Sequence, residues 1–327
     1  MLEIKLPTMP SNEWMSAIAK LFDGEYDRDS VYIKDNKQYF WGKYYELEKG
    51  LWFSYMHFNI SNEIIHHKLA DKNNNYYIID ISVSSNKLDR QIKQNSYNKT
   101  FGSTIGAYFE SSMIESLIKL PVKDDIEMFT VVMTKEFLEN ILHSAANDSS
   151  RIMFLLEDKP FCFYEPLLPE QLFRINKLIH ELSEKENYQF KTLFYKAVVF
   201  DILYNFLNRL EIRGDITFQN KIHPVDIENL AKVQEQIFNS PDSPPSIEKL
   251  AKSVTMSSSK LKGLFKQIYG TSIYHYYLSV RMQEAKKLIE IDKLSISEAG
   301  FKLGYTNLSH FAQVFRKYHG VLPSKLS

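Results

Sequence analysis

The sequence contains a single cysteine, Cys162, among its 327 residues. One cysteine cannot form an internal disulfide and supplies no cysteine cluster for a structural zinc, which is typical of a reducing compartment. Long apolar runs are missing too, because no stretch reaches 18 uncharged apolar residues and the charged Glu3 and Lys5 interrupt the N-terminus. The sequence therefore predicts a cytoplasmic protein that is neither exported nor inserted in a membrane.

Motifs of common enzyme sites are also missing. The sequence has no glycine-rich phosphate loop, no G-x-S-x-G and no H-E-x-x-H, and the surroundings of Cys162 do not suit a nucleophile. His57, His66 and His67 are candidate metal ligands, but no His-x-His pair occurs and Glu63 stands at the wrong place for a cupin metal box. We expect no catalytic site, no metal and no resident cofactor.

Aromatic residues, by contrast, make up 14% of the chain, which predicts a protein folded nearly throughout. The length and the 44% hydrophobic content suit two domains. The net charge is zero, yet residues 246–327 hold 13 Lys and Arg against 5 Asp and Glu, so the preceding part is acidic. A basic tail indicates an anionic polymer as its partner, although a solvated charged face has the same composition.

The front of the chain reads as strands and the rest as helices, which predicts an α+β fold. Aromatic and β-branched segments typical of strands, forming a small antiparallel sandwich or barrel, occur at 39–47, 51–60, 76–84, 101–110 and 126–134. A helix is expected at 135–143, and apolar spacing from residue 170 to 207 predicts two more, which form a hairpin or pack against a second subunit. The expected parts are a β-rich sensing domain at 1–168, a helical hairpin and possible dimerisation element at 169–213, a linker around Gly214 at 214–223, and an all-α domain at 224–327.

Two copies of a helix–turn–helix pattern occupy the basic tail. Small residues, Ala251 and Gly300, stand where the paired helices would cross. Thr255 and Gly304 mark the two turns, and Gly270 suits the end of the second helix. The expected helices are 247–254 and 258–270, then 296–303 and 308–320, joined by a long helix at 272–290. The side chains expected to cap them are Ser246, Ser257, Thr271, Ser295 or Ser297, and Asn307.

These residues resemble the DNA-binding domain of the AraC/XylS family over about 80 to 100 residues. The matching positions are Ala251, Leu261, Phe265, Gly270, Arg281, Ala285, Leu288, Gly304, Tyr305, Phe311, Phe315 and 320–323. Within the family, KLKGLFKQIYGTSIYHY and GYTNLSHF look most like the siderophore-responsive PchR branch. The resemblance implies a double helix-turn-helix domain behind an effector-sensing domain that is often a cupin-like barrel.

The resemblance also implies that the second helix of each unit enters one of two successive major grooves, about 34 Å apart. The base-reading positions that it implies are Ser259, Lys262, Gly263, Leu308, Ser309, His310 and Gln313. Lys262 suits guanine and Gln313 suits adenine. The phosphate-contacting positions are Lys260, Lys266, Arg316 and Lys317. Gly263 departs from the family, which often has a longer polar residue there, so weaker base reading by the first helix is expected. Gly300 stands where the family usually has Ala, at a cost in helix propensity of about 1 kcal/mol.

Aromatic side chains of the front domain, represented by Trp52, Tyr55 and Phe58, either line a pocket for a flat or apolar effector or simply form the core. If the PchR likeness extends forward, an iron–siderophore complex is one candidate effector.

Three hypotheses follow. The first is a ligand-responsive activator that binds double-stranded DNA and contacts RNA polymerase. The second is a regulator without a ligand, controlled by a protein partner or by its own abundance. The third is a DNA-tethered enzyme, which the missing motifs disfavour.

Overall fold

Two compact units divide the chain. The computed structural model describes residues 2–6, 12–27, 30–34, 38–94, 97–145, 151–165, 171, 174–175, 189–213 and 224–326. The first unit contains residues 1–165 and 189–221, and the second contains 166–188 and 222–327. The expected linker at 214–223 and most of the first helix of the expected hairpin lie outside the described residues.

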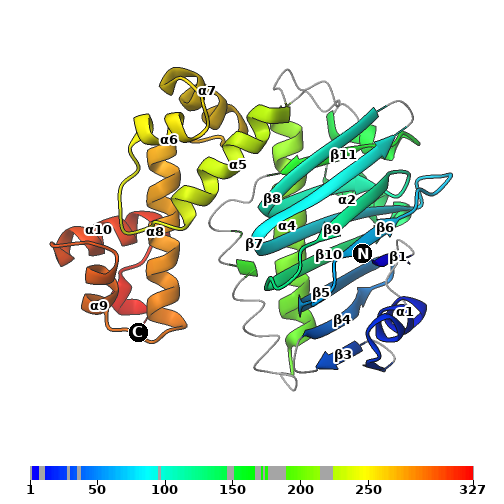
Figure 1. Cartoon of the computed structure of the whole chain (residues 1–327). Coiled ribbons are helices and arrows are strands. Elements are labelled where there is room, and N and C mark those ends of the chain that lie inside the picture. Colours follow the sequence, from blue (N-terminus) through cyan, green and yellow to red (C-terminus); the bar gives the residue numbers. More distant parts are fainter. Residues whose placement is uncertain are drawn as a thin grey trace. The chain divides into compact units, whose positions relative to one another are not determined.

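The first unit contains an eleven-stranded sheet within its described part (Figure 1). Its elements are β1 (Leu2–Leu6), α1 (Asn12–Phe22), β2 (Glu25–Tyr26), β3 (Ser30–Lys34), β4 (Tyr39–Glu48), β5 (Leu51–Asn59), β6 (Ile64–Lys68), β7 (Tyr76–Gln94), β8 (Tyr97–Ser111), β9 (Glu115–Leu120), β10 (Ile126–Thr134), α2 (Lys135–Ala145), a 3-10 helix (Arg151–Leu156), β11 (Cys162–Glu165) and α4 (Lys191–Arg213). The strands follow the order β1-β6-β9-β7-β10-β5-β4-β3-β2, and β8 pairs with β7 and β11. β1 and β6 pair in parallel, and the other pairs are antiparallel.

Strand β7 folds this sheet back on itself. Its register shifts between Val83 and Leu88; before the shift it pairs with β10, and after it with β9. Strands β6 and β9 therefore share one apolar core with β3, β4, β5 and β10, and α1 closes that core with Trp14, Met15 and Ile18. The opposite face of the sheet packs on α4, where the Tyr195 ring lies 5.0 Å from Tyr45.

The α+β class predicted from the sequence is confirmed. Three expected strands agree with β4, β5 and β10 to within one residue, and 76–84 and 101–110 are parts of the longer β7 and β8. The prediction missed α1 and the short strands β1, β2, β3, β6, β9 and β11. None of the helices in the described ranges is long and apolar enough to cross a membrane.

The second unit consists of two small helical cores that share one helix. Its elements are α5 (Pro224–Phe238), α6 (Ile247–Ser253), α7 (Ser258–Tyr269), α8 (Ile273–Glu290), α9 (Ile296–Lys302), α10 (Leu308–His319) and a 3-10 turn (Pro323–Lys325). The N-terminal half of α8, up to Val280, packs with α5, α6 and α7, whereas its C-terminal half, from Met282, packs with α9 and α10. Both helix pairs thus pack against the same helix, α8.

Cap chemistry explains why the helices of this unit begin where they do. The side chains of Ser246, Ser257 and Asn307 each accept a hydrogen bond from a backbone N–H of the first turn. Ser295 makes a full capping box with Glu298. The cap of α8 is Ser272, not Thr271 as expected, because Gly270 ends α7 and Thr271 then spans the gap between the two helices.

Candidate nucleic-acid interface

Each pair of helices presents its second helix after a tight turn. Thr255, with φ of 55°, forms the turn between α6 and α7, and Gly304, with φ of 75°, forms the turn between α9 and α10. Both second helices end at a left-handed glycine, Gly270 or Gly320. Two short helices of the same construction therefore stand on the two halves of α8.

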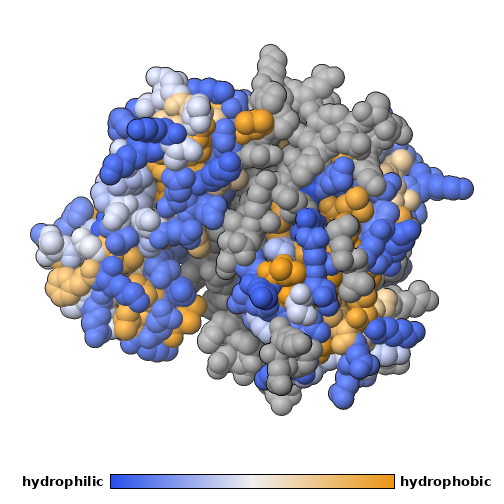
Figure 2. All heavy atoms as spheres, viewed as in Figure 1, coloured by the Kyte–Doolittle hydropathy of each residue, from blue (hydrophilic) through white to orange (hydrophobic). Residues whose placement is uncertain are grey.

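Most of the apolar stripe of each second helix is buried in the core. Leu261 and Phe265 of α7, and Phe311 and Phe315 of α10, have no solvent exposure. These aromatic rings consequently cannot act as stacking platforms for bases. Hydrophilic side chains cover most of the visible face of this unit (Figure 2).

The residues predicted to read bases lie on the outward side of the two helices. The exposed ones are Ser259, Lys262, Gly263, Ser309, His310 and Gln313. Leu308 differs, because it is half-buried and packs against Gly300 of α9. Gly263 faces open space, with no atom within 4 Å of an added Cβ, so a longer side chain would fit there.

The residues predicted to contact phosphates are also exposed, with one difference among them. Lys266, Arg316 and Lys317 form no ion pair with any residue that the structure describes. Lys260, by contrast, places Nζ 2.8 Å from Oδ1 of Asp226 in the first turn of α5. Three cations therefore point to solvent, and the fourth is held by a carboxylate of its own domain.

Arg281 and Tyr305, which the sequence analysis gave only as positions matching the family, contact the second turn, and the backbone of Asp242 lies close to it. Arg281 of α8 donates from Nε to the Leu303 carbonyl oxygen at 3.0 Å, and its guanidinium lies 3.9 Å from the centre of the Tyr305 ring. The carbonyl of Asp242 approaches Gly304 so closely that a Cβ there would lie 2.9 Å away. The signal that could have pointed to Arg281 is a cation between the apolar positions 280 and 282.

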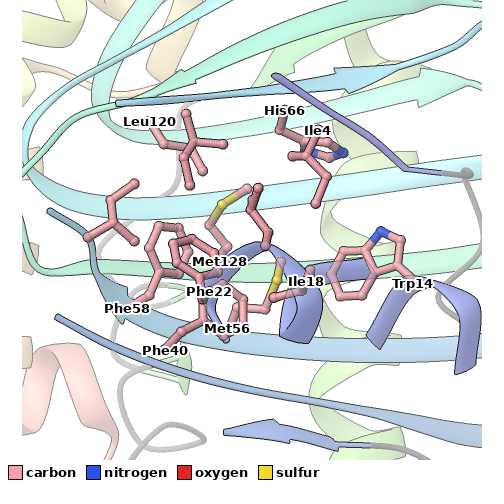
Figure 3. A pocket seen from close by; sticks show the side chains of 13 residues that line it. Ile4, Trp14, Ile18, Phe22, Phe40, Met56, Phe58, His66, Leu120 and Met128 are labelled. Atoms are coloured by element: carbon pink, nitrogen blue, oxygen red, sulfur yellow. The ribbon is translucent and has the colours of Figure 1, made fainter. Parts of the chain in front are cut away.

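A small apolar cavity of about 40 Å³ lies inside the folded sheet of the first unit (Figure 3). Trp14, Ile18 and Phe22 of α1 face Phe58 and Met128 of the sheet across it. Of the three residues predicted for an effector pocket, Phe58 lines this cavity. Tyr55 lies on the other face of β5, where its hydroxyl donates to Glu127, and Trp52 lies toward the other end of that strand.

His66 is the polar group at the edge of this cavity. Burial lowers the pKa of His66 to about 4, so its ring is neutral at pH 7. Nearby, Arg90 lies 2.9 Å from both Asp80 and Glu110, and Lys68 lies 2.9 Å from Glu110, so two buried cations balance two carboxylates. The cavity therefore offers an uncharged surface, and nothing in it suits a large, polar iron–siderophore complex.

Comparison with known proteins supports this view of the second unit. Residues 250–327 match the protein family described as "Helix-turn-helix domain". The chain is similar to the Msm operon regulatory protein of Streptococcus mutans, 35% identical over 79 residues, which are 24% of this chain and 28% of that protein. It is 28% identical over 122 residues to the arabinose operon regulatory protein of Escherichia coli K12, which are 37% of this chain and 42% of that protein.

Among solved structures, ToxT from Vibrio cholerae aligns over 84% of this chain and 97% of its own, with 12% identity and a TM-score of 0.32. The chain spans less than half the length of the two regulators that it matches in sequence.

Proposed function

We propose that residues 250–327, which match the family described as "Helix-turn-helix domain", form a DNA-binding domain like that of the AraC/XylS family, and that the chain is a sequence-specific DNA-binding transcription regulator. The observation that supports this most directly is the repeated arrangement of α7 and α10. Each is capped, buried on one side and polar on the other, and both are fixed to α8. Such a pair suits two successive major grooves, about 34 Å apart on one face of B-DNA.

Within this proposal the two helices divide the work by side-chain chemistry. Lys262 of α7 donates to guanine O6 and N7, and Gln313 of α10 pairs with adenine. Lys266, Arg316 and Lys317 neutralise phosphates and fix the register of the protein on the duplex. A regulator placed in this way beside a promoter is positioned to contact RNA polymerase and to act as an activator.

The first unit is proposed to sense a small, neutral, apolar effector. The cavity around Phe58 and Ile18 supports this, because its lining is apolar and His66 is uncharged at pH 7. A cavity of about 40 Å³ is too small for most ligands, so α1 must shift for one to enter. A regulator that works without a ligand is the alternative; extraction and mass spectrometry of protein purified from its own cells separates the two.

A homodimer is also proposed. Helix α4 exposes Leu193 (67%) and Tyr204 (63%), which lie about three turns apart along its outer side. A second copy of α4 is a suitable partner for such a stripe. Sedimentation of the wild type and of Leu193→Asp tests this, and equal masses for both proteins would contradict it.

In vitro selection from random duplexes with the whole chain tests DNA reading. The proposal predicts enrichment of a site with two conserved blocks whose centres are about one helical turn apart. Enrichment of a single block, or of none with the protein shown to be folded, would contradict it.

A further inference from the structure

Arg281 lies at the point where α8 passes from the first helical core to the second. Its neighbours Val280 and Met282 are buried in different cores. The side chain leaves this helix toward the turn between α9 and α10. Both Nε and Nη2 donate to the carbonyl oxygen of Leu303.

The Leu303 carbonyl is a group that needs such a donor. Leu303 is the C-terminal cap of α9, and the last carbonyls of a helix have no amide partner within the helix. A guanidinium is the best available partner, because it brings two donors and a positive charge to the negative end of the helix dipole. Arg281 therefore attaches the end of α9 to the middle of α8.

The same guanidinium also holds the residue that follows the turn. It stacks on the Tyr305 ring at 3.9 Å and lies 5.6 Å from the Tyr277 ring, so it is enclosed between two aromatic side chains. Tyr305 in turn packs on Phe311 at 5.2 Å and on His310 at 5.8 Å between ring centres. Only two residues separate Tyr305 from the first residue of α10. A displacement of Tyr305 is consequently passed directly to the N-terminal turn of that helix.

The turn also has close neighbours on the side where a Cβ of Gly304 would point. A Cβ at Gly304 would lie 2.9 Å from the Asp242 carbonyl oxygen and 3.5 Å from Arg281 Nη2. The turn thus lies close to α8 and to the loop between α5 and α6, while Gly304 itself is exposed. Contacts from the loop that precedes α6 and from the shared helix α8 therefore converge on this single turn of the second pair.

From this arrangement we infer that Arg281 is a positioning residue for base reading by α10. It sets where Ser309, His310 and Gln313 stand relative to α7, although its own contacts are with Leu303, Tyr305 and Tyr277. This inference rests on the proposed DNA-binding function. Losing Arg281 should therefore damage recognition of the second block of the site and leave recognition of the first block intact.

The test uses the full chain and three duplexes: the selected site, the same site with its first block scrambled, and the same site with its second block scrambled. Wild-type protein should lose affinity on either scrambled duplex; if it does not, the proposed function fails before the variants are compared. The penalty for scrambling a block is the factor by which affinity falls relative to the selected site. For Arg281→Met, the penalty for scrambling the second block should be smaller than that of the wild type by about tenfold or more. The penalty for scrambling the first block should stay unchanged.

Two further variants separate positioning from general stability. Lys287→Met removes a cation from the same helix, where it lies 3.8 Å from Glu284 and away from the turn, and should keep both penalties. Arg281→Lys keeps the charge and one donor but cannot stack flat on the Tyr305 ring. For this variant, scrambling the second block should cost less affinity than it costs the wild type, and scrambling the first block should cost the same. Equal weakening on all three duplexes would overturn the inference. If Arg281→Met does not fold, a second-block penalty in Arg281→Lys equal to the wild-type value would overturn it.

Discussion

Leu308, the first residue of α10, packs directly on Gly300 of α9. A Cβ atom at position 300 would lie 2.8 Å from Leu308 Cδ2 and 3.3 Å from Phe311 Cδ1. Gly300 therefore leaves the space that the Leu308 side chain occupies. Because Leu308 is a predicted base-reading residue, a side chain at position 300 would affect DNA recognition through packing. This explains why a residue with a helix-propensity cost of about 1 kcal/mol is compatible with the domain.

Gly300→Ala should change recognition more than stability. Alanine favours the helix by about 1 kcal/mol, but its methyl group must displace the half-buried Leu308 side chain, so the net change in unfolding free energy should stay within about 1 kcal/mol. Base preference in the second block should shift, which repeated selection measures. Gly263→Ala is the matched control for stability alone, because position 263 is itself a predicted base-reading position: no atom lies within 4 Å of its Cβ, so its unfolding free energy should rise by about 1 kcal/mol. Identical effects of the two substitutions would contradict this account.

Lys262→Ala and Gln313→Ala should each relax preference at one base pair, by roughly 1–3 kcal/mol. Lys317→Ala should weaken binding to all sequences alike and flatten the salt dependence, because a phosphate contact carries no sequence information. Binding titrations on single-base variants of the selected site distinguish these results. Equal, sequence-blind losses for all three proteins would refute the assigned reading faces.

Asp226→Asn should strengthen DNA binding without regard to sequence. Asp226 holds Lys260 at 2.8 Å, and a half-exposed pair of this kind adds little to stability, so its loss mainly frees the lysine for a phosphate. Affinity should rise several-fold, and the slope of affinity against salt should steepen by about one counterion. Asp292→Asn removes an exposed carboxylate elsewhere in the same unit. If Asp292→Asn raises DNA affinity by the same factor, the gain in Asp226→Asn comes from the change in net charge and not from release of Lys260.

His66 should make the first unit less stable as the pH falls. Its pKa is lowered to about 4 in the folded protein, against about 6.5 in an unfolded chain, so between these values the unfolded state binds a proton that the folded state does not. The contribution of His66 to stability is therefore complete above pH 6.5 and is lost toward pH 4. His66→Leu should show a smaller fall in unfolding free energy over this window. Other titrating groups are common to both proteins, so they cancel in the difference between the two unfolding free energies. Parallel curves of unfolding free energy against pH would refute the lowered pKa of His66.

The second unit could be predicted from the sequence in detail because its structure is locally encoded. Ser257 and Asn307 fix where α7 and α10 begin, and the apolar stripe that contains Phe265 fixes which side of α7 is buried. Exposure of Lys262 follows from the same periodicity. Helix α5 was missed, although Leu230 and Val233 are spaced as a buried stripe, because the preceding segment carries no clear start signal.

The first unit depended on contacts far apart in the chain. Alternation along β5 separates Tyr55 from Phe58, but it cannot tell which face encloses a cavity. That choice depends on the register shift in β7 and on β1, which pairs with β6 about 60 residues later. The contact of Arg281 with Leu303 is likewise invisible in the sequence, because it depends on how α9 packs against α8.

The central claim is that α7 and α10 read successive major grooves from one rigid support, and it is tested most directly by changing the spacing between the two blocks of the selected site. Insertion of half a helical turn should reduce the affinity of the full chain by at least about 100-fold, to that of a single block. Insertion of a full turn should not restore it, because α8 belongs to both cores and cannot lengthen. Affinity that stays the same at every spacing would show that the two helices read DNA independently and would contradict the account.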